Sequence, residues 1–209
     1  MNFFGHAAVA SWQAASPAAT LGAMLPDFAS MCRALLAPQD DPEVAAGVEL
    51  HHATDAVFHR APAVVGLFRD AEARLTARGV RKGPTRAAAH VGVELLLDGV
   101  LLDEPGYRRA YLAALGHAGP VAWRSDDGPA RYAALRARLR DHGTPTDLAS
   151  GAGVARRLAR ALAGRRLLEP TAPEHRAIAA VMGELVERVA AATPTVLTQV
   201  RAGLAPPAR

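Results

Sequence analysis

Apolar residues recur at helical spacing along most of this 209-residue chain, and proline and glycine separate the periodic stretches from one another. Strand-like alternation of apolar and polar residues does not extend beyond a few positions. The expected helices span, in chain order, residues 3–14, 20–37, 42–60, 62–78, 84–102, 106–116, 128–141, 147–168 and 173–203. The pattern therefore predicts an all-α fold class, a single-domain helical bundle of about eight helices.

Several helix boundaries are predicted by single residues. Pro26 lacks the backbone N–H that a helix interior needs, so we expect it to interrupt the helix over 20–37. Asp40 or Asp41 is the expected N-cap of the following helix. Gly79 suits the C-terminal end of the helix after that, because glycine tolerates the left-handed conformation found there.

No segment between the helices resembles a domain linker, so we expect one domain over residues 1–209, with a frayed tail at 203–209. Half of the residues are hydrophobic, which is enough for a sizeable core. No apolar stretch approaches the roughly 20 residues of a membrane span. Cys32 is the only cysteine, which agrees with a reducing compartment, and we expect a cytoplasmic protein. The sequence leaves the oligomeric state open.

The formal net charge is +4, and nearly all of the positive charge is arginine. This small excess is weak evidence for a polyanionic ligand, so no nucleic-acid partner is expected, whereas an acidic protein partner is compatible with it. The arginines concentrate in the segment GVARRLARALAGRR, residues 153–166. An amphipathic basic helix can meet an acidic partner or a membrane surface, but a solvated helix face is the preferred interpretation.

Two histidine–carboxylate pairs stand four residues apart within expected helices, His51 with Asp55 and His90 with Glu94. Residues four apart lie on the same face of a helix, so each pair can chelate one ion from a rigid support. Imidazole and carboxylate ligands suit a divalent metal such as Mn²⁺, Zn²⁺, Fe²⁺ or Mg²⁺. The alternative for either pair by itself is a surface salt bridge or a satisfied polar pair.

The surroundings of the second pair favour the metal. His90, Glu94 and Asp98 interrupt AAAHVGVELLLDGVLL, a helix otherwise too apolar to be exposed. Buried polar groups need partners, and buried charges need them most. A metal shared with the helix of His51 and Asp55 would supply one, with Asp98 as a possible additional ligand.

His6 and Asp27 also interrupt apolar sequence. The alternative for Asp27 is an N-cap after a helix break, and the alternative for His6 is a core histidine bonded to a backbone carbonyl. His52 and His59 are weaker candidates, which either face the same cleft or point to solvent. The sequence thus predicts one divalent-metal site, whose ligands are His6, Asp27, His51, Asp55, His90 and Glu94, with His52 as a further possible member.

Three motifs follow one another in the first part of the chain: MNFFGHAAVA with His6, GAMLPDF with Asp27, and GVELHHATD with His51 and Asp55. Together with the late arginine-rich helix they resemble the acyl carrier protein phosphodiesterases, a family within the HD-like metal-dependent phosphohydrolases. The resemblance covers nearly the whole chain and is most specific in residues 1–62. It implies an HD-domain-like fold and a metal-dependent phosphodiesterase that releases 4′-phosphopantetheine from holo-acyl carrier protein, an acidic partner, or from a related substrate.

The chain departs from that family at two places. His52 stands where the family usually has arginine. The later helix of the family reads D-x3-D-H, whereas here His90 and Glu94 are followed by Leu95. Metal binding can survive the exchange of ligands, but the substrate is expected to be either that of the family or another phosphopantetheine-type molecule.

A second resemblance rests on the same pairs and on LGAMLPD. In these features the chain is similar to zinc-dependent phospholipase C and related nucleases, and this similarity implies a zinc phosphoesterase. Both resemblances imply that the ion activates water and neutralises phosphate charge, while Asp55 or Asp27 orients or deprotonates the water as the catalytic residue. The further alternative is a non-catalytic helical protein that binds a structural ion or a partner.

Overall fold

The computed structural model describes residues 1–13 and 15–205, and these residues form an all-helical protein. The elements are α1 (Phe3–Ser11), α2 (Pro17–Cys32), α3 (Pro42–Phe58), α4 (Pro62–Ala77), α5 (Lys82–Leu101), α6 (Pro105–Gly116), α7 (Gly128–His142), the 3₁₀ turn η1 (Thr146–Ala149), α8 (Gly151–Leu162) and α9 (Ala172–Leu204). Over the described ranges the β-structure amounts to one isolated bridge, between Leu36 and Trp123. The predicted all-α class is therefore confirmed.

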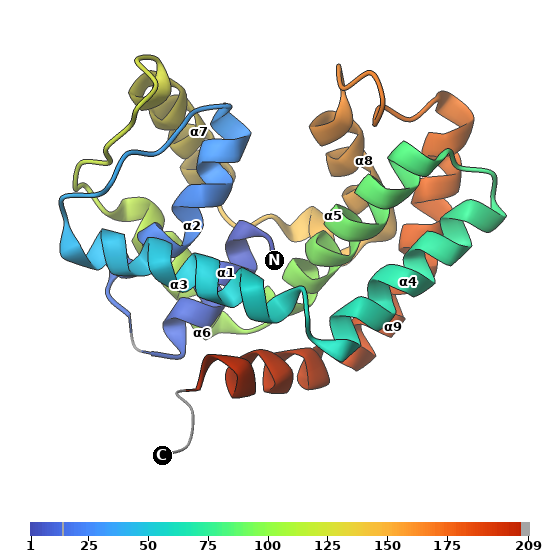
Figure 1. The fold of residues 1–209 in the computed structure, drawn as a ribbon, viewed down its shortest axis with the longest axis horizontal. Helices are drawn as coiled ribbons and strands as arrows, with labels where there is room; N and C mark the ends of the chain where they lie inside the picture. Colours follow the sequence, from blue (N-terminus) through green and yellow to red (C-terminus); the bar gives the residue numbers. More distant parts are fainter. Residues whose placement is uncertain (14, 206–209) are drawn as a thin grey trace. The chain divides into compact units, whose positions relative to one another are not determined.

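The chain divides into two compact units, each of them discontinuous in sequence. Unit 1 comprises Met1–Ala56 and Leu101–Pro145, which contain α1, α2, most of α3, α6 and α7 (Figure 1). Unit 2 comprises Val57–Val100 and Thr146–Arg209, which contain α4, most of α5, η1, α8 and α9. One domain can hold more than one compact unit, so the single domain expected over residues 1–209 stays a prediction.

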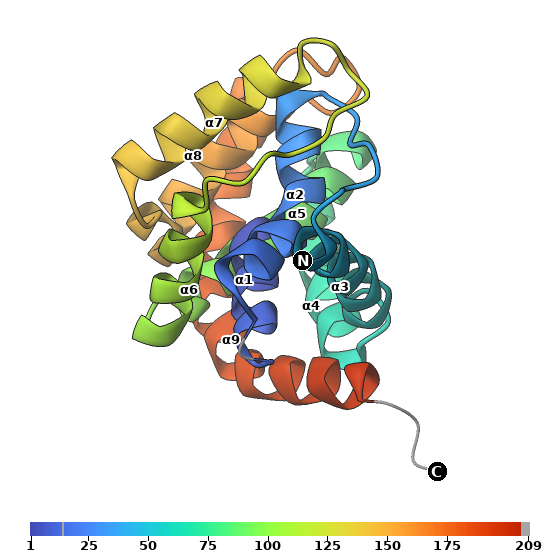
Figure 2. The same cartoon turned by 90° about the vertical axis from the view of Figure 1, so that its left-hand side faces the viewer.

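Aromatic side chains fill the core of unit 1, where α1 packs against α2 and α6 (Figure 2). The ring of Phe3 lies 5.4 Å from that of Phe28 in α2 and 6.0 Å from that of Tyr111 in α6, measured between centroids. Phe4 meets Tyr111 edge-on at 5.4 Å. These contacts fix α1 in the unit and, with it, the buried side chain of His6.

A pair of glycines lets α2 and α3 approach each other closely. A Cβ atom on Gly22 would lie 2.2 Å from the carbonyl oxygen of Val44, and one on Gly47 would lie 2.1 Å from that of Ala19. Any side chain at either position would force the two backbones apart. The close contact places the turn of α3 that carries His51 beside α2.

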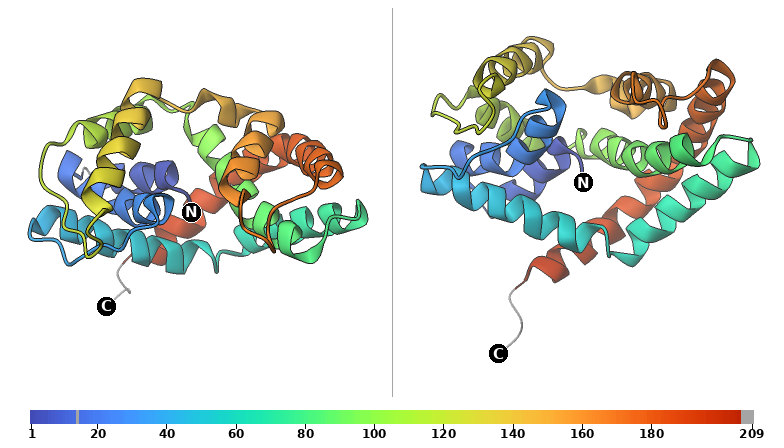
Figure 3. Two further views of the ribbon diagram at one scale, coloured as in Figure 1. Left: turned by 90° about the horizontal axis from the view of Figure 1, so that it is seen from above. Right: turned by 45° about the horizontal axis from the view of Figure 1, so that its top comes forward.

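In unit 2, α4 and α8 both pack on the long helix α9 (Figure 3). Glycine again permits the close contacts, because a Cβ atom on Gly151 of α8 would lie 2.2 Å from the backbone nitrogen of Gly183 in α9. A Cβ atom on Gly92 of α5 would lie 2.5 Å from Sδ of Met182, so α5 also reaches α9. These contacts hold α5, which carries His90 and Glu94, within unit 2.

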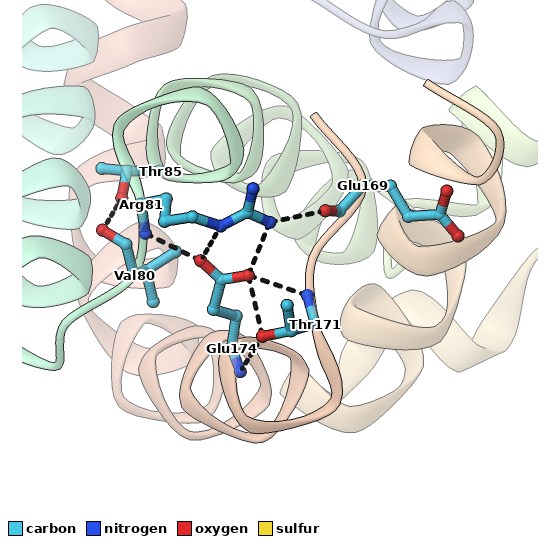
Figure 4. A network of polar contacts seen from close by, with 6 residues as sticks. All are labelled: Val80, Arg81, Thr85, Glu169, Thr171 and Glu174. Carbon is cyan, nitrogen blue, oxygen red and sulfur yellow. Dashed lines mark hydrogen bonds and ion pairs between the residues drawn. The ribbon is translucent and has the colours of Figure 1, made fainter. Parts of the chain in front are cut away.

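The buried carboxylate of Glu174, in the first turn of α9, links α9 to the residue that precedes α5 (Figure 4). Oε1 of Glu174 accepts hydrogen bonds from the backbone N–H and Nε of Arg81 at 2.9 and 2.8 Å, and Oε2 accepts one from Nη2 at 2.9 Å. The same carboxylate forms a capping box with Thr171. Hydrogen bonding from Arg81 lowers the pKa of Glu174 to about 2. The Arg81 guanidinium also donates to the carbonyl of Glu169, which ties the chain before α9 to the start of α5.

Two of the predicted helix boundaries are confirmed in detail. Oδ1 of Asp41 accepts hydrogen bonds from the backbone N–H groups of Glu43 and Val44, so Asp41 is the N-cap of α3. Gly79 has a φ of +74° just after α4 ends at Ala77, as expected of a glycine that terminates a helix.

The predicted interruption at Pro26 is wrong, because α2 runs through this residue without a break. An interior proline costs about 3 kcal/mol in a helix. Leu21, Met24, Leu25 and Phe28 of the same helix are fully buried, and this packing outweighs the local cost. As a result Asp27 lies inside a continuous helix.

The single helix predicted over 147–168 is also wrong, since η1 and α8 are separate elements. The hydroxyl of Ser150 accepts a hydrogen bond from the backbone N–H of Gly153 and starts α8 anew. The helix then ends at Leu162, shortly before Gly164 with its φ of +71°. The capping group of Ser150 therefore starts α8, and the helix ends where Ala163 leaves the helical conformation, just before Gly164.

The two chain ends differ from expectation as well. Helix α9 includes residues 203 and 204, which were expected in the frayed tail, and the rest of that tail from 206 to 209 lies outside the described residues. Helix α1 ends at Ser11, and residue 14, where its end was expected, also lies outside them. Among the helices that the structure describes, none has the length and apolar character needed to cross a membrane.

Candidate metal centres

Four of the predicted site residues meet in unit 1, where three different helices contribute them. His6 lies on α1, Asp27 on α2, and His51 and Asp55 on α3. His6, Asp27 and His51 each offer one ligand atom, and these three atoms lie within 4.8 Å of one another. Asp55 Oδ1 is 3.2 Å from Nε2 of His6, and its Oδ2 is 3.6 Å from Nε2 of His51. We name these four residues the His6 cluster.

The orientation of His51 is set by a backbone carbonyl. Its Nδ1 lies 2.9 Å from the carbonyl oxygen of Ala23 in α2. Burial and the neighbouring His6 lower the pKa of His51 to about 4, so the ring is neutral at neutral pH. A carbonyl only accepts hydrogen bonds, so Nδ1 carries the proton and Nε2 presents its lone pair toward Asp55. Metal-binding histidines are typically held in this way.

His6 is buried against His51. The two rings stack with centroids 3.8 Å apart and an angle of 25° between their planes. Nε2 of His6 also lies 2.9 Å from the carbonyl oxygen of Met1, which is the contact that the alternative interpretation of His6 predicted. His6 therefore has both the backbone contact of a core histidine and the neighbours of a metal ligand.

Asp55 is a partly exposed carboxylate surrounded by donors. Its Oδ1 accepts hydrogen bonds from the amino group of Met1 at 2.7 Å and lies beside His6. Burial acts to raise the pKa of Asp55, but the hydrogen bond from His6 and the hydrogen bond and positive charge of the Met1 amino group hold it well below its usual range. The carboxylate is thus ionised throughout the neutral range and attracts a cation.

Asp27 reaches the cluster from the interior of α2. The alternative interpretation, an N-cap after a break, is wrong because the helix does not break at Pro26. The position of Asp27 is therefore not explained by capping. Its carboxylate lies in the group formed with His6 and His51.

The second predicted pair lies in unit 2 with a third residue. Nε2 of His90 is 3.0 Å from Oε1 of Glu94, and Nε2 of His59 is 3.8 Å from the same oxygen. One ligand atom from each of the three lie within 4.8 Å of one another. We name His59, His90 and Glu94 the His59 cluster.

Five of the six ligands predicted for one site thus fall in two groups, one in each unit, and Asp55 lies against the histidines of the first. It stays a prediction that one ion binds both to the His6 cluster and to His90 and Glu94. Of the possible additional members, His52 is exposed and meets the edge of His51 at 5.3 Å. Asp98 is fully buried in α5. Among the described residues, neither belongs to the groups whose ligand atoms lie close enough together to hold an ion.

His59, a weaker candidate from the sequence, is a member of this cluster. A signal for it was present, since His51, Asp55 and His59 follow one another at intervals of four residues. Its partnership with His90 depends on how the chain after α3 packs against α5. Helical spacing within one segment does not give that information.

The donor chemistry of both groups fits a divalent cation. Each combines imidazole nitrogens with carboxylate oxygens, a set that suits Zn²⁺, Mn²⁺ or Fe²⁺ and, for the carboxylates, Mg²⁺. The His6 cluster offers two rings and two carboxylates, and the His59 cluster offers two rings and one carboxylate. Comparisons with protein-family models, with curated proteins and with solved structures gave no match to this chain.

Proposed function

We propose that this protein is a divalent-metal-dependent phosphodiesterase and that the His6 cluster is its metal centre. The observation that supports this most strongly is the convergence of His6, Asp27 and His51 from three helices within 4.8 Å, with Asp55 against both histidines. Besides the Met1 amino group that pairs with Asp55 and the backbone carbonyls that contact the two histidines, an ion would be a partner common to all four residues and would offset the cost of gathering them. A divalent cation is the partner that suits all four.

Each residue has a distinct role in this proposal. His6 and His51 hold the ion through ring nitrogens, and the Ala23 carbonyl keeps His51 in the tautomer that can do so. Asp27 completes the ligand set. A bound divalent ion lowers the pKa of water and neutralises phosphate charge. Asp55, held ionised by its donors, orients the attacking water and accepts its proton, a role that Asp27 could share.

The proposed substrate is holo-acyl carrier protein or a related phosphopantetheine-type molecule, cleaved in the cytoplasm. An acidic carrier protein would need a basic surface, and α8 provides one. Arg156 and Arg160 are exposed on α8, while Val154, Leu158 and Leu162 of the same helix are buried. The arginines are therefore placed to meet a partner without disturbing the core of unit 2.

The test is the conversion of holo-acyl carrier protein to its apo form, followed by the mass of the carrier protein. Protein loaded separately with Mn²⁺, Zn²⁺, Fe²⁺ or Mg²⁺ is compared with metal-free protein and with the variants Asp27→Asn and His51→Gln. We expect conversion with at least one metal and its loss in both variants. His142→Gln, at an exposed histidine of unit 1, is the matched control and should retain the activity.

A generic phosphodiester tested in parallel separates the reaction from its substrate. Turnover of the generic ester alone would retain the metal-dependent phosphodiesterase but remove the carrier protein as substrate. If neither compound is cleaved by protein that has been shown to contain the ion, the proposed activity is wrong.

A further inference from the structure

We propose that unit 2 carries a second divalent-cation site of its own, the His59 cluster, and that the adjoining pocket binds the phosphate group of an ester with an apolar stem. This inference goes beyond the activity proposed for the His6 cluster and does not depend on it. It rests on the geometry of the cluster, on the charges of one face of α5, and on the lining of the pocket.

The geometry of the His59 cluster is close to that of a loaded site. Ligands about 2.0–2.2 Å from a Zn²⁺ ion stand roughly 3–3.5 Å from one another. The separations from Oε1 of Glu94 are 3.0 Å to Nε2 of His90 and 3.8 Å to Nε2 of His59. One ligand atom of each of the three residues lies within 4.8 Å of the others, so His59 has to move closer for one ion to bind all three.

The cluster combines a fixed carboxylate with accessible rings. The side chain of Glu94 is only 9% exposed, whereas those of His59 and His90 are 32% and 48% exposed. Phe68 of α4 stacks on His90 with centroids 4.7 Å apart and planes 14° apart, and so fixes the plane of that ring. An ion can reach the site from solvent and meet the buried Glu94 carboxylate beside a His90 ring whose plane is already fixed.

A row of side chains continues from the cluster along α5. Lys82, Arg86, His90 and Glu94 are spaced four residues apart, so consecutive members lie one turn apart on the same side of the helix. The row places two cations beyond the histidine and the carboxylate. An anion that lies against Lys82 and Arg86 would thus adjoin the ion at His90.

An open pocket of about 660 Å³ follows this row. Its lining includes Lys82, Arg86 and His90, and its other side chains are apolar. The apolar members are Ala87 and Val91 of α5 and Leu167 and Leu168 from the segment before α9. Leu167 is 79% exposed, which leaves a large apolar side chain at the rim. Charge and apolar surface together favour an anionic head on a hydrocarbon-like stem.

The two cations of the pocket are not committed to carboxylates. Among the described residues neither Lys82 nor Arg86 forms an ion pair with a carboxylate, although Glu72 lines a neighbouring pocket with both of them. The neighbouring Arg81 contrasts with them, because Glu174 binds it through both of its oxygens (Figure 4). Lys82 and Arg86 are therefore available to a phosphate, to which both side chains donate well.

The wall of the pocket is held firmly. A Cβ atom on Gly83 would lie 2.1 Å from the carbonyl oxygen of Leu167, so the segment before α9 rests directly on the start of α5. Arg81 binds the carbonyl of Glu169 two residues farther along. The apolar and the basic sides of the pocket are thus fixed in relation to each other.

The first test counts ions in the full-length protein. Co²⁺ is added to metal-free protein and followed by visible absorption, with isothermal titration of Zn²⁺ in parallel. We expect two ions in the parent protein. A His59→Gln/His90→Gln double variant should lose one ion and a His51→Gln variant the other, whereas the control His175→Gln, in α9 of unit 2, should retain both.

The outcomes separate this inference from the proposed function. If the His51→Gln variant binds one ion and loses it when His90 is also replaced, the site in unit 2 is supported even if the His6 cluster proves inactive. A single ion in the parent protein that either His51→Gln or His90→Gln removes would mean one shared site and would overturn the inference. Two ions that are unaffected by the double variant would overturn it as well.

The second test measures hexyl phosphate binding to Zn²⁺-loaded protein by titration calorimetry. Replacement of both Lys82 and Arg86 by glutamine should weaken binding about tenfold or more, the usual effect of losing a charge-assisted hydrogen bond. The control Arg69→Gln/Arg176→Gln removes two exposed charges of unit 2 and should bind like the parent. Inorganic phosphate should bind more weakly than hexyl phosphate. Equal affinity of the parent and the Lys82/Arg86 variant would refute the phosphate pocket.

Discussion

His51 shows how the packing around one side chain prepares it as a metal ligand. Its place on a helix face with Asp55 follows from the four-residue spacing and could be predicted from sequence. The proton on Nδ1 follows from the Ala23 carbonyl of another helix and could not. The spacing thus predicts which residues share a face, while the tautomer depends on tertiary contacts.

Replacement of His51 by glutamine should abolish tight metal binding in unit 1. The change removes a ligand and not only its support, so the affinity for Zn²⁺ or Mn²⁺ should fall by more than the ~10–100-fold that loss of a supporting hydrogen bond costs. Titration calorimetry of the site in unit 1 measures this directly. His142→Gln should leave the affinity unchanged, and an affinity of His51→Gln within twofold of the parent would exclude His51 as a ligand.

At the level of the helices, proline and glycine act according to their surroundings. Gly79 ends α4 as expected, whereas Pro26 does not break α2, because buried side chains on both sides of it hold the helix together. Ser150 and Gly164 limit α8 in a region that the apolar pattern predicts as one longer helix. Sequence patterns thus give the number and type of helices well and their exact ends less well.

The glycine contact between α2 and α3 should control both stability and metal binding. Gly22→Ala places a methyl group 2.2 Å from the Val44 carbonyl, and such overpacking typically costs about 1–3 kcal/mol. Urea denaturation should show this loss, and metal affinity should fall with it because α2 carries Asp27 and the carbonyl that orients His51. The control Gly66→Ala has no neighbour within 4 Å and should raise stability by up to about 1 kcal/mol. Equal stability of the two variants would contradict the close contact.

The Glu174 network should make part of the stability of unit 2 depend on pH. The pKa of Glu174 is lowered from 4.5 to about 2 in the folded protein, chiefly by hydrogen bonding from Arg81. As the pH falls, the Glu174 carboxylate is therefore protonated in the unfolded chain before it is protonated in the folded protein. Stability is lost as the pH falls from about 4.5 to 2. Urea denaturation should show Glu174→Gln less stable than the parent at pH 7, with a difference that narrows across this range. A difference that stays constant down to pH 2.5 would show that the carboxylate does not carry the effect.

For the whole molecule, the sequence indicates which side chains lie together on one helix better than which helices bring their side chains together. All six predicted ligands lie in one of two clusters, but His90 and Glu94 are joined by His59 within unit 2. The spacing along a helix is local, whereas the grouping depends on which segments far apart in sequence fold into one unit. The polypeptide passes between the units near the end of α3, near the end of α5 and before η1, and His59, just after α3, thus belongs to a different cluster from His51 and Asp55.

The basic face of α8 should matter only for a macromolecular substrate. Arg156→Glu/Arg160→Glu should raise KM for an acidic carrier protein severalfold, mostly at low ionic strength, and leave turnover of a small phosphodiester unchanged. Steady-state kinetics at two salt concentrations measure both effects. Equal losses of activity on both substrates would indicate damage to the fold. Unchanged kinetics on both would show that α8 takes no part in substrate recognition.

The metal content of the purified protein tests the His6 cluster most directly. The protein is reconstituted with Zn²⁺ or Mn²⁺, desalted and analysed by elemental mass spectrometry beside Asp27→Asn and His51→Gln. We predict that the parent retains stoichiometric metal and that each variant retains one ion fewer per chain. A parent protein that retains no divalent metal, or variants that retain as much as the parent, would contradict a metal centre formed by His6, Asp27, His51 and Asp55.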